Sequence, residues 1–121
     1  MPVKSLSSSV LKWPDAPSVD QAARRWAARV VRARNDVRRI GYFGSYARGD
    51  WGVGSDFDLI IVLDHSALPF EKRASEWDVI ELPVSTDVLV YTQDEWRALG
   101  NSRFRQTIDH EAIWIYVGDN C

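Results

Sequence analysis

The sequence has very little cysteine, since Cys121, the last residue, is the only one in 121. A single cysteine forms no intramolecular disulfide and cannot build a zinc site with other cysteines. We therefore expect a protein of the reducing cytoplasm. A chain of this length buries about two-thirds of its unfolded surface, so it should fold as one domain without such cross-links.

Long apolar runs and a strong net charge are also lacking. No apolar run approaches the length of a membrane span, and the N-terminus has no hydrophobic signal-peptide region, so we predict no membrane contact. The 15 lysines and arginines nearly balance 17 acidic residues, for a formal net charge of -2. The field of the whole molecule therefore argues against nucleic acid as a direct ligand.

The chain divides into a short arm and one domain. Residues 1–17 are rich in serine and proline and have no hydrophobic period, which predicts a flexible N-terminal arm. Residues 18–121 should form a single domain. Its first helix is expected to begin with a capping box at Ser18 and Gln21 and to run to about Asn35.

The rest of the domain alternates between strands and helices. Apolar, β-branched segments predict strands at Val37 to Phe43, Phe57 to Leu63, Val84 to Tyr91 and Ala112 to Val117. Helical spacing and caps predict helices at Pro69 to Leu82, Thr92 to Leu99 and Arg103 to Ile108. This order predicts an α/β (α+β) fold, with a small mixed β-sheet covered mainly on one face by helices. The order of the strands does not follow from it.

Two carboxylates stand at the mouth of the second predicted strand. Asp56 and Asp58 are two residues apart, and side chains at that spacing leave a strand on the same face. Two such carboxylates repel each other, and a divalent cation relieves the repulsion. Carboxylates together with substrate phosphates are the usual ligands of Mg²⁺. Taken alone, the pattern is also common among solvated loop carboxylates.

A candidate phosphate site precedes this pair. Gly44 and Ser45 stand where the first strand passes into a turn, and glycine lets the backbone approach a phosphate closely. The Ser45 hydroxyl adds another donor. Arg48 lies one helical turn further on and can face the same anion. These three residues are the predicted nucleotide-binding group.

Asp87 lies inside an otherwise apolar predicted strand, where an unpaired charge is costly. If that strand neighbours the one that begins near Asp58, three carboxylates converge and could hold two metal ions about 3.5–4 Å apart. The alternative is an ion pair between Asp87 and one of the many arginines.

The segments GSYARG at 44–49 and SDFDL at 55–59 closely resemble the signature of the nucleotidyltransferase superfamily with the polymerase-beta-like fold, and above all its minimal nucleotidyltransferases, the MNT or MntA-like proteins. The resemblance implies transfer of a nucleoside monophosphate from a triphosphate, expected to be ATP, to an acceptor hydroxyl. It implies that Gly44 and Ser45 hold the triphosphate. It also implies that Asp56, Asp58 and Asp87 are catalytic and bind magnesium, with Asp87 helping to deprotonate the acceptor.

The minimal nucleotidyltransferases that the sequence resembles are commonly the antitoxins of helical HEPN-domain toxins, and some adenylylate a tyrosine of the toxin. We therefore expect a partner protein as acceptor. Two alternatives remain: a binding module that neutralises a partner by occlusion alone, and a small-molecule transferase of the aminoglycoside type. The intact acidic residues disfavour the first. The second is weakened because those enzymes carry a further acceptor-binding domain.

Three other features allow two interpretations each. Trp51 either stacks on a nucleotide base or packs under its glycine-rich loop. The apolar strand at 113–117 is either covered or an interface. The arginines of the first helix form either a solvated face or a docking surface; they are Arg24, Arg25, Arg29 and Arg32.

Overall fold

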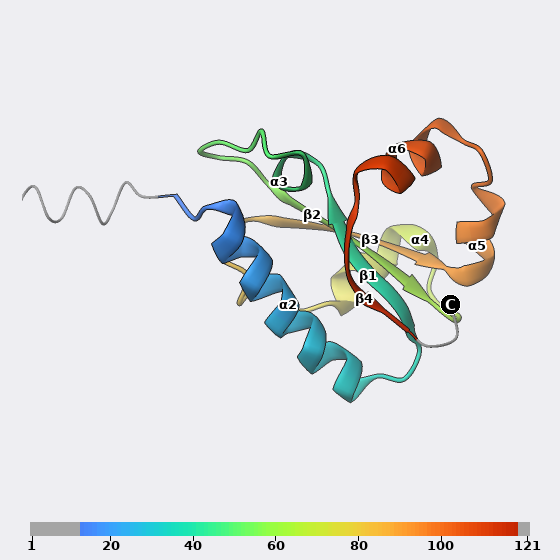
Figure 1. Ribbon diagram of the computed structural model, residues 1–121. Coiled ribbons are helices and arrows are strands. Elements are labelled where there is room, and N and C mark those ends of the chain that lie inside the picture. Colours follow the sequence, from blue (N-terminus) through green and yellow to red (C-terminus); the bar gives the residue numbers. More distant parts are fainter. Residues whose placement is uncertain (1–12, 119–121) are drawn as a thin grey trace, which may run out of the picture.

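The computed structural model describes residues 13–118, which form a four-stranded sheet with helices packed on it (Figure 1). Its strands are β1 (Val37–Phe43), β2 (Phe57–Leu63), β3 (Thr86–Thr92) and β4 (Ile113–Val117). Its helices are α2 (Ala16–Ala33), α3 (Ser45–Arg48), α4 (Phe70–Arg73), α5 (Gln93–Ala98) and α6 (Arg103–Glu111), with a 3-10 turn, η1 (Ala74–Glu76), after α4. Residues 1–12 of the predicted arm, and Cys121, lie outside the described residues.

Helix α2 is capped by Asp15, so the prediction of a cap at Ser18 was wrong. The Asp15 carboxylate accepts a hydrogen bond of 3.0 Å from the Ser18 N–H. Pro17 fits the first turn because the N–H it lacks would have no partner there. Ahead of the helix, the Trp13 indole N–H donates to the Tyr46 hydroxyl at 2.9 Å. The folded unit therefore begins before residue 18.

The sheet is mixed, as predicted, and its order is β3-β2-β1-β4. Strand β1 pairs antiparallel with both β2 and β4, whereas β2 and β3 are parallel. A parallel pair requires a crossover, which residues 64–85 provide. The starts of β2 and β3 and the end of β1 therefore meet at the same end of the sheet.

Much of that crossover is not helical, so the helix predicted from Pro69 to Leu82 was wrong beyond residue 76. Trp77 is already extended, with φ -107° and ψ 120°. Its ring is buried 6.3 Å from that of Trp26 in α2, and the Trp26 indole N–H donates to the Asp78 carbonyl at 2.7 Å. These contacts with α2 hold the segment in an extended path that helical spacing alone does not indicate.

Strand β2 lies at the centre of two apolar cores. Phe57, Leu59, Ile61 and Leu63 pack in the larger core with the buried face of α2. Ile60 and Val62 point to the opposite face, where they meet Trp96 of α5 and Ile108 of α6. The predicted α+β class is confirmed. The larger core lies on the α2 face, and α5 and α6 cover the other face.

Arg73 is a buried cation that ties the crossover to β3 and α5. It is 5% exposed, and its two terminal nitrogens donate to the Glu95 carboxylate at 2.5 and 3.0 Å. It also donates to the carbonyls of Leu68 (2.8 Å) and Val90 (3.1 Å). Glu95 completes the predicted capping box with Thr92. The hydrogen bonds from Arg73 are the main reason that the pKa of Glu95 falls to about 2.

We predict that Glu95→Gln lowers the free energy of unfolding at pH 7 by about 1–2 kcal/mol, a value reduced because Glu95 is partly exposed. Glutamine keeps the capping box, so the loss comes from the charge. The folded pKa lies below the unfolded value of 4.5, so the contribution is complete above pH 4.5 and disappears as the pH falls towards 2. Urea unfolding followed by tryptophan fluorescence measures it.

The control is Asp94→Asn, a neighbouring carboxylate whose side chain is 87% exposed and pairs only with exposed Arg97. It should change stability by less than about 0.5 kcal/mol. An equal deficit of the Glu95→Gln variant at pH 2.5 and pH 7 would contradict the ion pair.

Candidate active site

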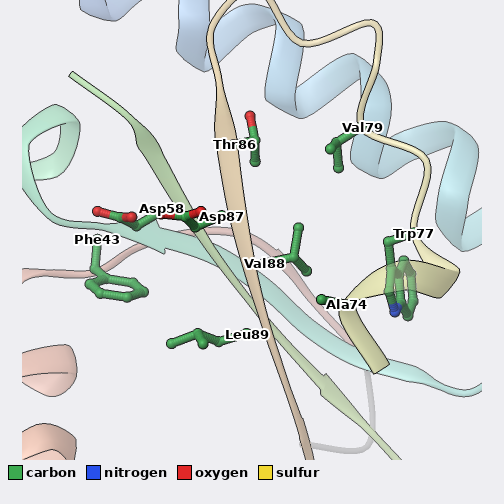
Figure 2. A pocket seen from close by; sticks show the side chains of 9 residues that line it. All are labelled: Phe43, Asp58, Ala74, Trp77, Val79, Thr86, Asp87, Val88 and Leu89. Atoms are coloured by element: carbon green, nitrogen blue, oxygen red, sulfur yellow. The ribbon is translucent and has the colours of Figure 1, made fainter. Parts of the chain in front are cut away.

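The strand register brings Asp58 and Asp87 side by side. Asp58 is the register partner of Asp87 in parallel β3 and of Phe43 in antiparallel β1. Because paired residues project to the same face of a sheet, the two carboxylates lie on the α6 face, beside the Phe43 ring. Figure 2 shows both carboxylates next to each other on neighbouring strands. This convergence was predicted from the sequence only on condition that β3 neighbours β2.

The backbone at Gly44 lies directly against the Asp58 carboxylate. Its φ of 81° and ψ of -155° suit only glycine, and a Cβ at this position would overlap the Asp58 carboxylate. The Gly44 carbonyl accepts hydrogen bonds from the N–H groups of Ala47 (3.0 Å) and Arg48 (2.9 Å), which closes the short turn α3. The glycine predicted for close approach to a phosphate is thus also required for close approach to a carboxylate.

The charges around Asp58 are mostly of its own sign. Burial raises the pKa of Asp58, and the charges of Asp87 and Asp56 raise it further, while Arg48 opposes them. Asp56 and Asp87 are themselves exposed. The ionised form of the half-buried Asp58 carboxylate is therefore unfavourable in the fold, and a cation bound at its oxygens would relieve that cost.

Within residues 13–118, no three carboxylate, histidine or cysteine side chains converge closely enough to hold a metal ion as they stand. Asp58 and Asp87 are adjacent, whereas Asp56 precedes β2 in an exposed position. No arginine of this part of the chain forms an ion pair with Asp87, so the alternative of a structural pair is not observed. The carboxylates of Asp56, Asp58 and Asp87 offer oxygen atoms as ligands, which suits Mg²⁺.

Most of the predicted site residues line one open hollow of about 650 Å³. It is lined by Gly44, Ser45, Arg48, Asp56 and Asp58, together with Phe43 and four residues of α6: Arg103, Phe104, Thr107 and Glu111. A second hollow of about 500 Å³, shown in Figure 2, shares Phe43 and Asp58 with the first and contains Asp87. The two hollows therefore meet at Asp58.

Helix α6 is the part of the site that sequence reasoning missed. The Glu111 carboxylate accepts a hydrogen bond of 2.7 Å from the Gly44 N–H and lies 3.4 Å from an Arg48 terminal nitrogen. Arg48 also donates to Asp50 at 3.1 Å. No motif marks Glu111, because its role depends on α6 folding back over a turn more than sixty residues earlier in the chain.

Two features that were open to two interpretations are packed into the fold. The Trp51 ring stacks on the Tyr46 ring, with centroids 5.5 Å apart and planes 6° apart, so it packs under its loop. In β4, Ile113 and Ile115 pack against the larger core and Trp114 packs against the smaller one. That strand is therefore half-covered, with four half-buried residues and an exposed Val117 at the edge of the sheet.

Comparison with known families identifies the class of protein. The model of the nucleotidyltransferase domain matches residues 24–114, which is more than half of the chain. The chain therefore belongs to the nucleotidyltransferase domain family, and the hollow that contains Gly44, Ser45 and Asp58 is its candidate active site. Its activity is nucleotidyl transfer. None of the curated protein sequences compared with the chain matches it.

Solved structures share the fold at low sequence identity. A putative nucleotidyltransferase from Sulfolobus solfataricus gives a TM-score of 0.59 at 17% identity, covering 88% of this chain and 91% of that one. A toxin-antitoxin structure with AMP-PNP gives 0.55 at 15% identity, covering 80% of this chain and 75% of that one. A mutant of the toxin-antitoxin MntA-HpeT gives a TM-score of 0.51 at 13% identity, again covering 80% of this chain and 75% of that one.

No helix in residues 13–118 is long and apolar enough to cross a bilayer.

We predict that Gly44→Ala lowers stability by about 3 kcal/mol or more, because a Cβ there overlaps Asp58 and the backbone conformation is closed to alanine. The matched control is Gly49→Ala, which also has a positive φ (89°) but open space around its Cβ, and it should cost only about 1 kcal/mol. Chemical denaturation of both variants measures the difference. Equal costs would show that Gly44 does not need its close approach to Asp58.

Proposed function

We propose that this nucleotidyltransferase moves AMP from ATP to a hydroxyl of a partner protein and acts as the antitoxin of a toxin-antitoxin pair, with a HEPN-domain toxin as the partner. The observation that carries the proposal is the hollow in which the Gly44 N–H, the Arg48 guanidinium and the Asp58 carboxylate face one space. The partner class is supported by two proteins of the same fold that are toxin-antitoxin structures, one of them with AMP-PNP.

Each side of the hollow suits one part of the reaction. The Gly44 N–H, the Ser45 hydroxyl and Arg48 are donors and would hold phosphate oxygens. Asp56, Asp58 and Asp87 would hold two Mg²⁺ ions, which neutralise the triphosphate and promote ionisation of the acceptor hydroxyl. Asp87 would accept the proton as the acceptor oxygen bonds to the α-phosphorus. The bond from the α-phosphorus to the bridging oxygen breaks, and pyrophosphate leaves.

The second hollow is the candidate acceptor site. It lies around the edge strand β3: exposed Asp87 is on one side of this strand, and Trp77, Val79 and Val88 form an apolar wall on the other side (Figure 2). A partner could contact this apolar wall with one part of its surface while a hydroxyl such as that of tyrosine faces Asp87 at the edge of the sheet.

We predict that wild-type protein incubated with α-labelled ATP, magnesium and cell lysate transfers label to a protein, and that Asp58→Asn abolishes the transfer. The variant should also melt at a higher temperature than wild type at pH 7 without metal, because burial and the neighbouring carboxylates destabilise the Asp58 charge. Asp94→Asn removes an exposed charge far from the hollow and should change neither result. Rapid nucleotidylation of a free aminoglycoside by the isolated chain would instead favour a small-molecule transferase.

We predict that ATP stabilises the protein more strongly with magnesium than without it. A ligand at a hundredfold excess over its Kd adds about 2.7 kcal/mol to the free energy of unfolding. Ser45→Ala should reduce this gain without abolishing it, because the Gly44 N–H and Arg48 remain. Thermal melts with and without magnesium measure the effect. Equal shifts under both conditions would show that protein donors alone hold the phosphates.

A further inference from the structure

Glu111, the last residue of α6, holds two of the three donors that the proposed function assigns to the triphosphate. Its carboxylate accepts the Gly44 N–H at 2.7 Å, and the same oxygen lies 3.4 Å from Arg48. The Glu111 side chain is 14% exposed, so this contact is largely shielded from water, whereas the Arg48 side chain is 48% exposed. Of the described carboxylates, only Glu111 accepts the Gly44 N–H.

A carboxylate oxygen and a phosphate oxygen need the same hydrogen-bond donors at this position. Both are anionic acceptors, and both are best satisfied by a backbone N–H together with a guanidinium. The Gly44 N–H can serve only one of them at that distance. A phosphate that entered the hollow beside an unmoved Glu111 would also meet a second negative charge, in addition to that of Asp58.

We propose that Glu111 is a further residue of the nucleotide site, which in the free protein occupies the position of a phosphate oxygen and has to be displaced by the incoming triphosphate. This inference rests on the proposed function, because it assumes that Gly44 and Arg48 bind phosphate. Glu111 therefore acts as a built-in competitor that lowers the affinity of the site for every anion.

The cost of displacing Glu111 is the same for every anion, so the further contacts that each anion gains decide how tightly it binds. Inorganic phosphate would gain little more than the two contacts that Glu111 gives up. A triphosphate gains further contacts, at the Ser45 hydroxyl and through its magnesium, so it can offset the loss of the Glu111 contacts. Glu111 thus weakens the binding of every anion by the same factor, and only a ligand with further contacts, such as a magnesium-bound triphosphate, still binds tightly.

The position of Glu111 allows the displacement without unfolding α6. The next residue, Ala112, is already extended (φ -66°, ψ 143°), so Glu111 stands at the junction of α6 and β4. The helix is held from within by buried Ile108 and by an edge-to-face contact of Phe104 with Phe43, at 5.9 Å. A change in the Glu111 side-chain torsions alone would free the Gly44 N–H.

The test measures the binding of magnesium ATP and of inorganic triphosphate by isothermal titration calorimetry. Glu111→Gln keeps the shape and an acceptor for Gly44 but removes the charge, and Glu111→Ala removes the competitor. We expect about tenfold tighter binding of both ligands to Glu111→Ala and a smaller gain for Glu111→Gln. The control is Asp109→Asn, which removes the same charge from α6 at a residue that pairs with Arg105, and its affinities should equal those of wild type.

Thermal melts keep the test independent of any folding defect. Without ligand, Glu111→Ala should melt below wild type because the Gly44 N–H loses its partner, yet magnesium ATP should raise its melting temperature by more than it raises that of wild type. Unchanged or weaker binding by both Glu111 variants, with wild-type binding intact, would overturn the competitor role and leave the nucleotide site standing. If neither ligand bound to any variant, the nucleotide site itself would fail, and this inference with it.

Discussion

The parallel pairing of β2 with β3 places two carboxylates of like charge side by side, and the site is organised around that repulsion. Asp58 is half-buried between Phe43 and Asp87, and its pKa is raised by burial first and by its acidic neighbours second. Such a pair is unfavourable in a free protein. The two apolar cores on either side of β2 provide the stability that holds it in place.

The same crowding explains why donors surround the acidic pair. Gly44 approaches Asp58 so closely that a Cβ would overlap its carboxylate, and both residues line the same hollow. Arg48 reduces the negative field at Asp58. Glu111 satisfies both donors in the free protein. The site is therefore a balance of anions and donors that an entering magnesium triphosphate would rearrange without requiring a new backbone conformation.

Different segments of the chain form the walls of the two hollows. Helix α6 forms one wall of the hollow that Gly44, Ser45 and Arg48 also line, whereas the extended segment around Trp77 forms the apolar wall of the second hollow. Asp58 lines both. Under the proposed function, the donor nucleotide and the acceptor hydroxyl would approach this carboxylate from the two hollows. This geometry suits transfer to a side chain offered by another protein.

The sequence by itself determined the features that depend on near neighbours along the chain. Strands β1 and β2 lie where apolar, β-branched residues gather, and the capping box joins Thr92 with Glu95 three residues on. Tertiary structure alone decided the strand order, the extended path of Trp77 and the contact of Glu111 with Gly44. Those features join residues dozens of positions apart, and their free energy comes from burial and hydrogen bonds that exist only once α2 and α6 have packed on the sheet.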